Sequence, residues 1–161
     1  MKDIITNEFV YELYDSNKLD HISLIEELSN DYLTNEFFKD YKSIIDKTDS
    51  ENYFTYIILN RYGLIGLITL TKIKEDTFVL SYIIKPSFRG QKYSSRTKID
   101  FINYLFNTNK ASKILCYIDI NNIRSINSMM KTNPTKIEKT KDNNLLLVTY
   151  EKTKENLLTN K

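Results

Sequence analysis

A short turn between a strand and a helix holds the residues of this chain that are best suited to chemistry. An apolar strand at 77–84 runs through a proline into Arg89-Gly90, and a helix follows at once. The first turn of a helix has four backbone N–H groups without partners, with the positive end of the helix dipole behind them. Arg89, Lys92 and Arg96 add formal charge beside these groups. We therefore expect this turn to bind a phosphate or pyrophosphate.

A surface loop with no ligand is the alternative, because strand-turn-helix junctions with one glycine occur in most α/β proteins. The flanking residues favour a binding site. Pro86, Arg89 and Gly90 resemble the cofactor loop of the GNAT superfamily of N-acetyltransferases, which is a strand, then Pro-x-x-Arg-Gly-x-Gly-x-Gly/Ala, then a helix. The resemblance implies that the anion belongs to acetyl coenzyme A.

A second segment resembles the same family at the expected distance downstream. The family's fifth strand is followed by Asn-x-x-Ser-Ile and a lysine, and Asn122, Ser125, Ile126 and Lys131 stand at those places. Two half-motifs in the correct order are more specific than either one. The branch typified by ribosomal-protein N-terminal acetyltransferases is the most similar, and the resemblance covers roughly residues 78–131.

The resemblance also implies how the cofactor binds. The pantetheine arm would pair with the backbone of Tyr82 and Ile84, in a gap between the family's fourth and fifth strands, and backbone N–H groups would hold the pyrophosphate. Asn122 would face the pantetheine arm, cap the helix that follows it, or do both. The expected cofactor-binding residues are Tyr82, Ile84, Arg89, Gly90, Gln91, Lys92, Tyr93, Ser94, Ser95 and Asn122. We expect Arg89→Glu to abolish cofactor binding and to leave the fold intact.

The chain departs from the family pattern in the loop, at the base and at the acid, and Asn133-Pro134 stands where the pattern ends in Gly-Phe. Lys92 and Ser94 stand where the loop has its second and third glycines, so the backbone can approach the phosphates less freely. Val79 replaces a glutamate that serves as the water-linked base in the ribosomal-protein branch. Met129 replaces the tyrosine that commonly protonates the departing thiolate. The base and the acid are therefore not assigned by the motifs.

Ser125 and Asp119 are the expected catalytic residues. Ser125 occupies the serine of the Asn-x-x-Ser motif, an acid proposed for the ribosomal-protein branch, and Ser128 lies one turn further on. Asp119, at the end of a strand, could attract a cationic amine or relay its proton. The alternatives are a solvated serine and a solvated strand-end charge. We expect five tyrosines to be mostly core or rim aromatics, one of which could replace the missing acid: Tyr11, Tyr14, Tyr32, Tyr41 and Tyr93.

Two residue types give weaker signals. His21, the only histidine, falls in the first expected helix, and we expect it to lie at the surface. Cys116 is the only cysteine, which excludes an internal disulfide, and its place in an apolar strand predicts a buried, inert thiol. No cluster of His, Cys and Asp has the spacing of metal ligands, so we expect no metal.

Length and composition limit the class of protein. The 161 residues fit a single domain at 1–151 with a polar tail at 152–161. With 41% hydrophobic and 27% charged residues, the chain is neither disordered nor membrane-embedded. The net charge of +2, from 23 basic and 21 acidic residues, does not predict nucleic-acid binding. The start of the chain lacks the apolar stretch of a signal peptide, so we expect a cytoplasmic protein. We expect the protein to be a monomer or a homodimer.

Hydrophobic periodicity predicts the order of elements from residue 9 onward. The expected strands are 9–14, 53–59, 64–72, 77–84, 114–120, 135–140 and 145–151, and the expected helices are 19–28, 35–45, 93–107 and 123–131. This order matches the α/β (α+β) GNAT fold. It predicts a mixed, mostly antiparallel sheet of six to seven strands, flanked by about four helices and splayed between strands 4 and 5.

The leading hypothesis is an acetyl-CoA-dependent N-acetyltransferase. It would move an acetyl group directly, in a ternary complex, to a primary amine of a peptide terminus or a small molecule. A GNAT-fold module that holds acyl-CoA or a partner protein without turnover is the alternative, favoured by Val79, Met129, Lys92 and Ser94. The sequence does not identify the acceptor amine.

Overall fold

The computed structural model describes residues 1–37 and 51–153. Within this part of the chain the strands form one mixed sheet in the order β1-β2-β3-β4-β5-β6-β8-β7. Neighbouring strands are antiparallel except for β5 and β6, which are parallel. The strands are β1 Ile4–Ile5, β2 Val10–Leu13, β3 Tyr53–Asn60, β4 Gly63–Lys74, β5 Thr77–Ile84, β6 Lys113–Asp119, β7 Lys136–Lys139 and β8 Leu145–Glu151.

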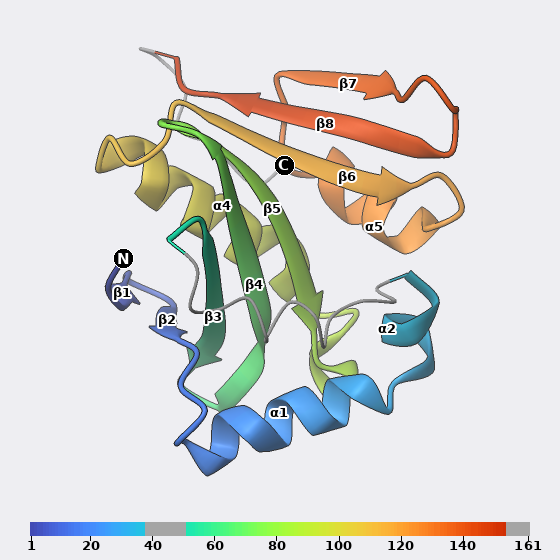
Figure 1. Ribbon diagram of the computed structural model, residues 1–161. Helices are drawn as coiled ribbons and strands as arrows, with labels where there is room; N and C mark the ends of the chain where they lie inside the picture. The colour runs from blue at the N-terminus through green and yellow to red at the C-terminus, as the bar shows by residue number, and fades with distance from the viewer. Residues whose placement is uncertain (38–50, 154–161) are drawn as a thin grey trace.

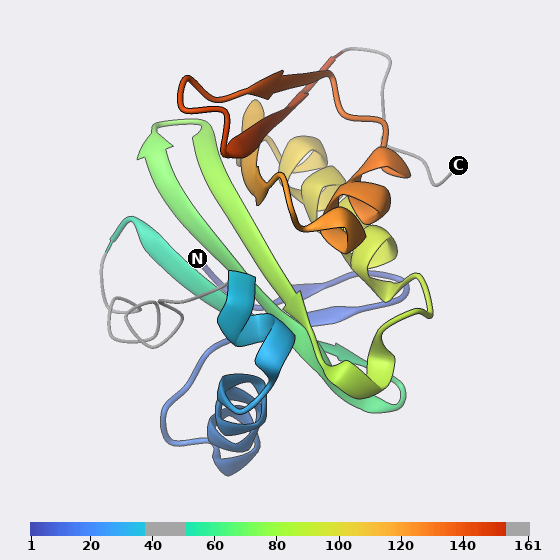
Figure 2. The ribbon, with the colours of Figure 1, turned by 90° about the vertical axis from the view of Figure 1, so that its right-hand side faces the viewer.

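Helices cover both faces of the sheet. Figures 1 and 2 show α1 and α2 on one face and α4 and α5 on the other. A 3-10 turn, η1, connects the end of β5 to the loop before α4. The described helices are α1 Leu19–Ser29, α2 Tyr32–Phe37, η1 Pro86–Phe88, α4 Tyr93–Asn107 and α5 Ile123–Met130. None of the helices in residues 1–37 and 51–153 is long and apolar enough to cross a membrane.

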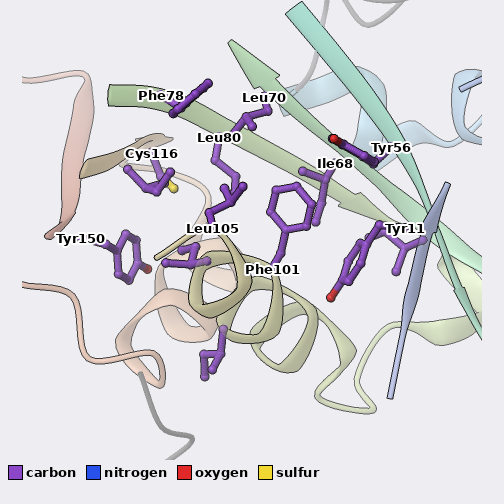
Figure 3. Packing of buried hydrophobic residues seen from close by; sticks show 14 of the residues in the cluster. Tyr11, Tyr56, Ile68, Leu70, Phe78, Leu80, Phe101, Leu105, Cys116 and Tyr150 are labelled. Atoms are coloured by element: carbon purple, nitrogen blue, oxygen red, sulfur yellow. The ribbon is translucent and has the colours of Figure 1, made fainter. Parts of the chain in front are cut away.

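The larger core lies between the sheet and α4. Ile68 and Leu70 of β4 and Leu80 of β5 belong to it, together with Phe101 and Leu105 of α4 (Figure 3). These strand residues alternate along the chain, as a two-residue period requires for one face of a sheet. The apolar stripe of α4 therefore fixes the helix, and with it the turn at its N-terminus, against β5.

A smaller core fixes α1 on the opposite face. Leu24 and Leu28, one turn apart on α1, pack with Ile57, Leu67 and Ile83 of the three central strands. Each of these strand residues is followed directly by a member of the larger core, Ile58, Ile68 or Ile84, so the central strands are buried on both faces. This explains why their sequences are nearly continuous apolar runs.

The two halves of the sheet separate between β5 and β6. Their parallel pairing covers only Thr77 to Val79, opposite Lys113 to Leu115. Beyond Val79 the strands diverge (Figure 1), and residues 80–84 of β5 pair with β4 alone. The expected splay between the fourth and fifth long strands is confirmed.

The structure corrects several expected boundaries. It adds the two-residue β1, so the described sheet has eight strands instead of six or seven. Lys18 occupies the N-cap position of α1 without a side-chain bond. The expected helix 35–45 falls mostly outside the described residues, and α2 begins earlier, at Tyr32. The expected bounds of β5, α4 and β8 are confirmed.

Gly66 permits a close approach of β4 to β5, and we expect its substitution to be costly. A Cβ atom at Gly66 would lie 2.1 Å from the carbonyl oxygen of Ile83, so the two strands would have to move apart. Overpacking of this kind costs about 1–3 kcal/mol. Gly66→Ala should lower the free energy of unfolding by about 2 kcal/mol in urea denaturation. Ser81→Ala, on the adjoining strand, should be nearly neutral, and equal effects would contradict this interpretation.

Candidate functional site

The loop before α4 has the backbone conformation of an anion cradle. Gly90 has a φ of 77°, and Lys92, the N-cap of α4, has a φ of 64°. Lys92 thus keeps the left-handed backbone conformation that glycine favours, at a position where the family pattern has a glycine. Lys92 has no side-chain capping bond, and the N–H groups of Tyr93, Ser94 and Ser95 have no partner among the described residues. These donors are available to an anion.

A cavity of about 730 Å³ extends from this loop into the space between β5 and β6. Its walls come from α2, the end of β5, the start of α4, the end of β6 and α5. A groove of this size and shape fits an extended ligand with an anionic end at the cradle. The lining residues are Leu33, Thr34, 80–84, Phe88, Arg89, Gly90, 92–95, 116–119, Asn122, Arg124, Ser125, Asn127, Ser128 and Lys131.

The backbone of β5 directs polar groups toward this cavity. The Lys85 N–H donates to the Ile65 carbonyl at 2.9 Å, so Lys85 is in a hydrogen-bonded pair with β4. Hydrogen-bonded and non-hydrogen-bonded pairs alternate in an antiparallel ladder. Tyr82 and Ile84 are therefore in non-bonded pairs, and their N–H and C=O groups point away from β4 toward the splay. The Ile84 carbonyl accepts from the Arg89 side chain, so the groups directed to the splay for a ligand are the two N–H groups and the Tyr82 carbonyl.

The side chain of Arg89 binds α2 and the end of β5 instead of projecting into the cradle. Its guanidinium donates to both carboxylate oxygens of Asp31, at 3.1 and 2.7 Å, and to the Thr34 hydroxyl at 3.2 Å. Its Nε donates to the Ile84 carbonyl at 2.9 Å. Four of the five N–H donors of arginine are used in this way, so at most one remains for a phosphate.

The Arg89–Asp31 pair joins the α1–α2 segment to the loop before α4. Hydrogen bonds from Arg89, then from Thr34, lower the pKa of Asp31 to about 2. The Asp31 carboxylate also accepts from the N–H of Thr34 at 2.8 Å, as an N-cap does. A second ion pair, Lys85 to Glu27 at 2.7 Å, joins the same two parts of the molecule.

Of the other residues expected to bind an anion at this loop, some line the cavity and others lie outside it. Arg96 pairs with Glu8 and is not among the residues that line the cavity, so its charge lies outside the cradle. The Gln91 side chain donates to the Ser87 carbonyl at 3.0 Å and also lies outside the lining. Lys92 lines the cavity, is exposed and has no ion pair among the described residues. Of the expected cations, Lys92 is therefore best placed to meet an anion.

The N-terminus of α5 faces α4 across the cavity. Asn122 caps α5, because its side-chain oxygen accepts from the Ser125 N–H at 3.0 Å. Asn122 and Ser125 both line the cavity, so capping and contact with a ligand are compatible. The hydroxyls of Ser94 and Ser128 lie 2.7 Å apart and join the first turn of α4 to the second turn of α5.

The Tyr82 side chain joins this group of hydroxyls, although only its backbone was expected at the site. Its phenol oxygen lies 3.5 Å from the Ser125 hydroxyl. Lys98, on α4, lies over its ring, with Nζ 4.2 Å from the ring centroid. Two-residue periodicity places Tyr82 on the same face of β5 as Leu80 and Ile84, which is a signal that could have indicated this direction from sequence.

The remaining candidates lie as follows. Asp119 lines the cavity at the end of β6, half-buried, and accepts from the Asn121 N–H at 2.8 Å. Tyr93 lines it too, packed edge-on against Phe88. Tyr11, Tyr14 and Tyr32 do not line it, and Tyr41 lies outside the described residues.

His21 is fully buried, so the expectation of a surface position was wrong. Its Nδ1 accepts from the Asp15 N–H at 3.1 Å, and its ring stacks on Tyr14 with centroids 6.0 Å apart. Leu24 and Leu28 follow at i+3 and i+7, a spacing that places His21 on the buried face of α1. His21 is a structural residue remote from the cavity lining.

Cys116 is buried as expected, and burial raises the pKa of its thiol to about 11. A neutral thiol is a poor nucleophile. Residues 1–37 and 51–153 contain no group of three or more His, Cys, Asp and Glu side chains that could hold a metal ion.

Comparison with known proteins decides the family. The model of the acetyltransferase (GNAT) domain family matches residues 8–133, well over half of the chain. The chain belongs to the GNAT acetyltransferase family. No curated protein matches the GNAT chain in a sequence search.

Solved structures show the same fold at low identity. Campylobacter jejuni N-acetyltransferase PseH is 14% identical, with a TM-score of 0.69 over 90% of this chain and 99% of that one. The ribosomal L7/L12 acetyltransferase RimL, solved with coenzyme A, is 11% identical, with a TM-score of 0.68 over 92% and 96%. Vibrio cholerae spermidine N-acetyltransferase, solved with coenzyme A and spermine, is 13% identical, with a TM-score of 0.69 over 91% and 97%.

Two departures from the GNAT pattern can now be placed. Val79 is at the last paired rung of β5 and β6, opposite Leu115, where the splay begins. Met129 is fully buried in the larger core and cannot donate a proton. The positions that the sequence resemblance assigns to the family's base and acid therefore carry no titratable group in this GNAT protein.

Proposed function

We propose that this GNAT protein is an acetyl-CoA-dependent N-acetyltransferase that moves an acetyl group to a primary amine in a ternary complex. The observation that carries the proposal is the anion cradle at the end of the splay between β5 and β6. The cradle is positioned for the pyrophosphate and the open edge of β5 for the pantetheine amides. Peptide termini and polyamines are the acceptor classes to test first, because neighbours of the same fold are named for such activities.

Some residues of the cavity bind the cofactor, and others attract the amine and transfer its proton. The N–H groups of the Gly90–Ser95 loop hold the pyrophosphate, and Lys92 adds charge beside it. Asn122 contacts the pantetheine arm while it caps α5. Asp119, at the acceptor end of the cavity, attracts the cationic amine, and Ser125 provides a hydroxyl for proton relay. Transfer then requires mainly that the amine and the thioester be held together.

Isothermal titration with coenzyme A tests the proposal most directly. We expect micromolar binding that weakens with salt, because the pyrophosphate is anionic. A thiol-release assay with acetyl-CoA and a panel of peptide and polyamine amines should then identify the acceptor. Absence of binding at millimolar coenzyme A would end the proposal.

A catalytically inactive GNAT module that holds acyl-CoA or a partner protein is the second candidate. Val79 and Met129, in place of the family's titratable groups, favour it. Binding of coenzyme A with no turnover across a broad amine panel would support this candidate. Turnover that falls in Asp119→Asn or Ser125→Ala would exclude it.

A further inference from the structure

Lys98 is a fully buried lysine that forms no ion pair with an acidic side chain among the described residues. Its side chain is 0% exposed, and its Nζ has no hydrogen-bond partner among the described residues. Lysines are almost never fully buried unless paired, since an ammonium group loses its hydration. This amine lies over the face of the Tyr82 ring, 4.2 Å from Nζ to the centroid. The placement of Lys98 therefore points to Tyr82.

Tyr82 lies between the lysine and the cavity. Its side chain belongs to the lining, and its phenol oxygen is 3.5 Å from the hydroxyl of Ser125, at the N-terminus of α5. Its own backbone lies on the open edge of β5, where we propose that pantetheine binds. A phenol at this point can reach a ligand in the splay, while Lys98 stays on its inner side.

The charges around Tyr82 favour its ionised form. Burial would raise the pKa of Tyr82, but the charge of Lys98, with hydrogen bonds that include the hydroxyls of Ser125 and Ser94, outweighs it and lowers the pKa below the ordinary 10.0. Two other titratable groups interact with this pair: Tyr150 of β8 with Tyr82, and Cys116 of β6 with Lys98. Burial raises the pKa of each, so both are neutral near pH 7. Lys98 is thus the charged group that acts on Tyr82 within the described residues.

We propose that Tyr82 is the general acid of the acetyl transfer and that Lys98 is its positioning residue. The assignment rests on the proposed function and supplies the acid that Met129 cannot provide. As the amine nitrogen bonds to the acetyl carbon and the carbon–sulfur bond breaks, the Tyr82 proton passes to the sulfur. Lys98 stabilises the phenolate, which regains the proton lost by the amine through Ser125 or solvent. The net change is one proton moved from nitrogen to sulfur.

Kinetics of matched variants test the assignment once an acceptor is in hand. Tyr82→Phe should lower kcat by about 100-fold or more, as loss of general acid catalysis does, with an unchanged Kd for coenzyme A. Lys98→Met should lower kcat, shift the basic limb of the pH profile upward and leave the Kd unchanged, and Lys98→Arg should restore part of the rate. Tyr104→Phe is the control, because Lys110 lies over that ring in the same way, 4.8 Å from Nζ to the centroid, outside the cavity.

Titration of the tyrosines tests the pair without turnover. In protein labelled with ¹³C at tyrosine Cζ, the signal absent from Tyr82→Phe should titrate below pH 10 in the parent and at higher pH in Lys98→Met. Titration at or above pH 10, or an unchanged titration in Lys98→Met, would overturn the role of Lys98. Unchanged kcat in Tyr82→Phe would overturn the role of Tyr82.

Failure of the assignment can be told from failure of the proposed function. A parent that transfers acetyl groups while Tyr82→Phe remains fully active refutes the assignment and leaves the function standing. A parent that binds coenzyme A and acetylates no amine refutes the function and, with it, the assignment. A parent that binds no coenzyme A refutes both at the first step.

Discussion

Ser94→Asp should weaken coenzyme A binding by about 100-fold or more while leaving the protein folded. Ser94 is in the first turn of α4 and lines the cavity beside the cradle. A carboxylate there would occupy the donors intended for the pyrophosphate. Two like charges about 4 Å apart repel by about 4 kcal/mol at an effective dielectric constant of about 20, which exceeds a 100-fold change in Kd.

The same substitution should not destabilise the free protein, and this separates binding from folding. An acidic residue in the first turn of a helix is stabilising by about 0.3–1 kcal/mol. Ser94→Asn is the matched control, equal in size and uncharged, and it should bind coenzyme A nearly as well as the parent. Calorimetry gives the Kd and thermal unfolding gives the stability. Tight binding by Ser94→Asp would show that the pyrophosphate does not bind at the start of α4.

The fold could be predicted from sequence because its main signals are local. The apolar run of β5, the apolar stripe of α4 and the turn formers at 141–144 before β8 are all contained in short windows, and the expected bounds of these three elements are confirmed. The two-residue β1 could not be found in this way, since so short a strand has no periodicity. Its pairing with β2 depends on tertiary structure.

The candidate site could be predicted from the sequence only in part, for a related reason. The backbone of the cradle follows from local conformation, but side-chain partners depend on residues far away in sequence. Arg89 was assigned to the anion because it stands in the loop motif, while its actual partner, Asp31, lies 58 residues earlier. Lys98 did carry a local signal, because it is one turn before Ile102 on the buried stripe of α4.

Arg89→Glu is expected to abolish detectable coenzyme A binding, and the structure gives a different reason from the sequence. The substitution would place a second carboxylate against Asp31 and remove the bond to the Ile84 carbonyl. Breaking a buried ion pair in this way lowers the free energy of unfolding by about 3–5 kcal/mol, and by somewhat less at a half-buried site such as this one. We therefore expect the unfolding temperature to fall as well, contrary to the sequence-based expectation of an intact fold.

The pH dependence of stability should reveal the same ion pair. The folded pKa of Asp31, about 2, is depressed from 3.8, so the stabilisation is present above about pH 4 and is lost as the pH falls toward 2. Arg89→Ala should remove this part of the acid dependence. Urea denaturation of parent and variant between pH 7 and pH 3 measures it, and equal slopes in the two proteins would contradict the pairing.

A charge swap decides whether Arg89 acts on the loop or on the phosphate. In the double variant Arg89→Glu with Asp31→Arg, the opposite charges face each other again, so the link between α2 and the cofactor loop is restored. If Arg89 serves mainly as this link, as its four occupied donors indicate, stability and coenzyme A affinity should recover together. Recovery of stability without affinity would show that the guanidinium contacts the pyrophosphate directly. The swap therefore separates two roles that Arg89→Glu alone combines.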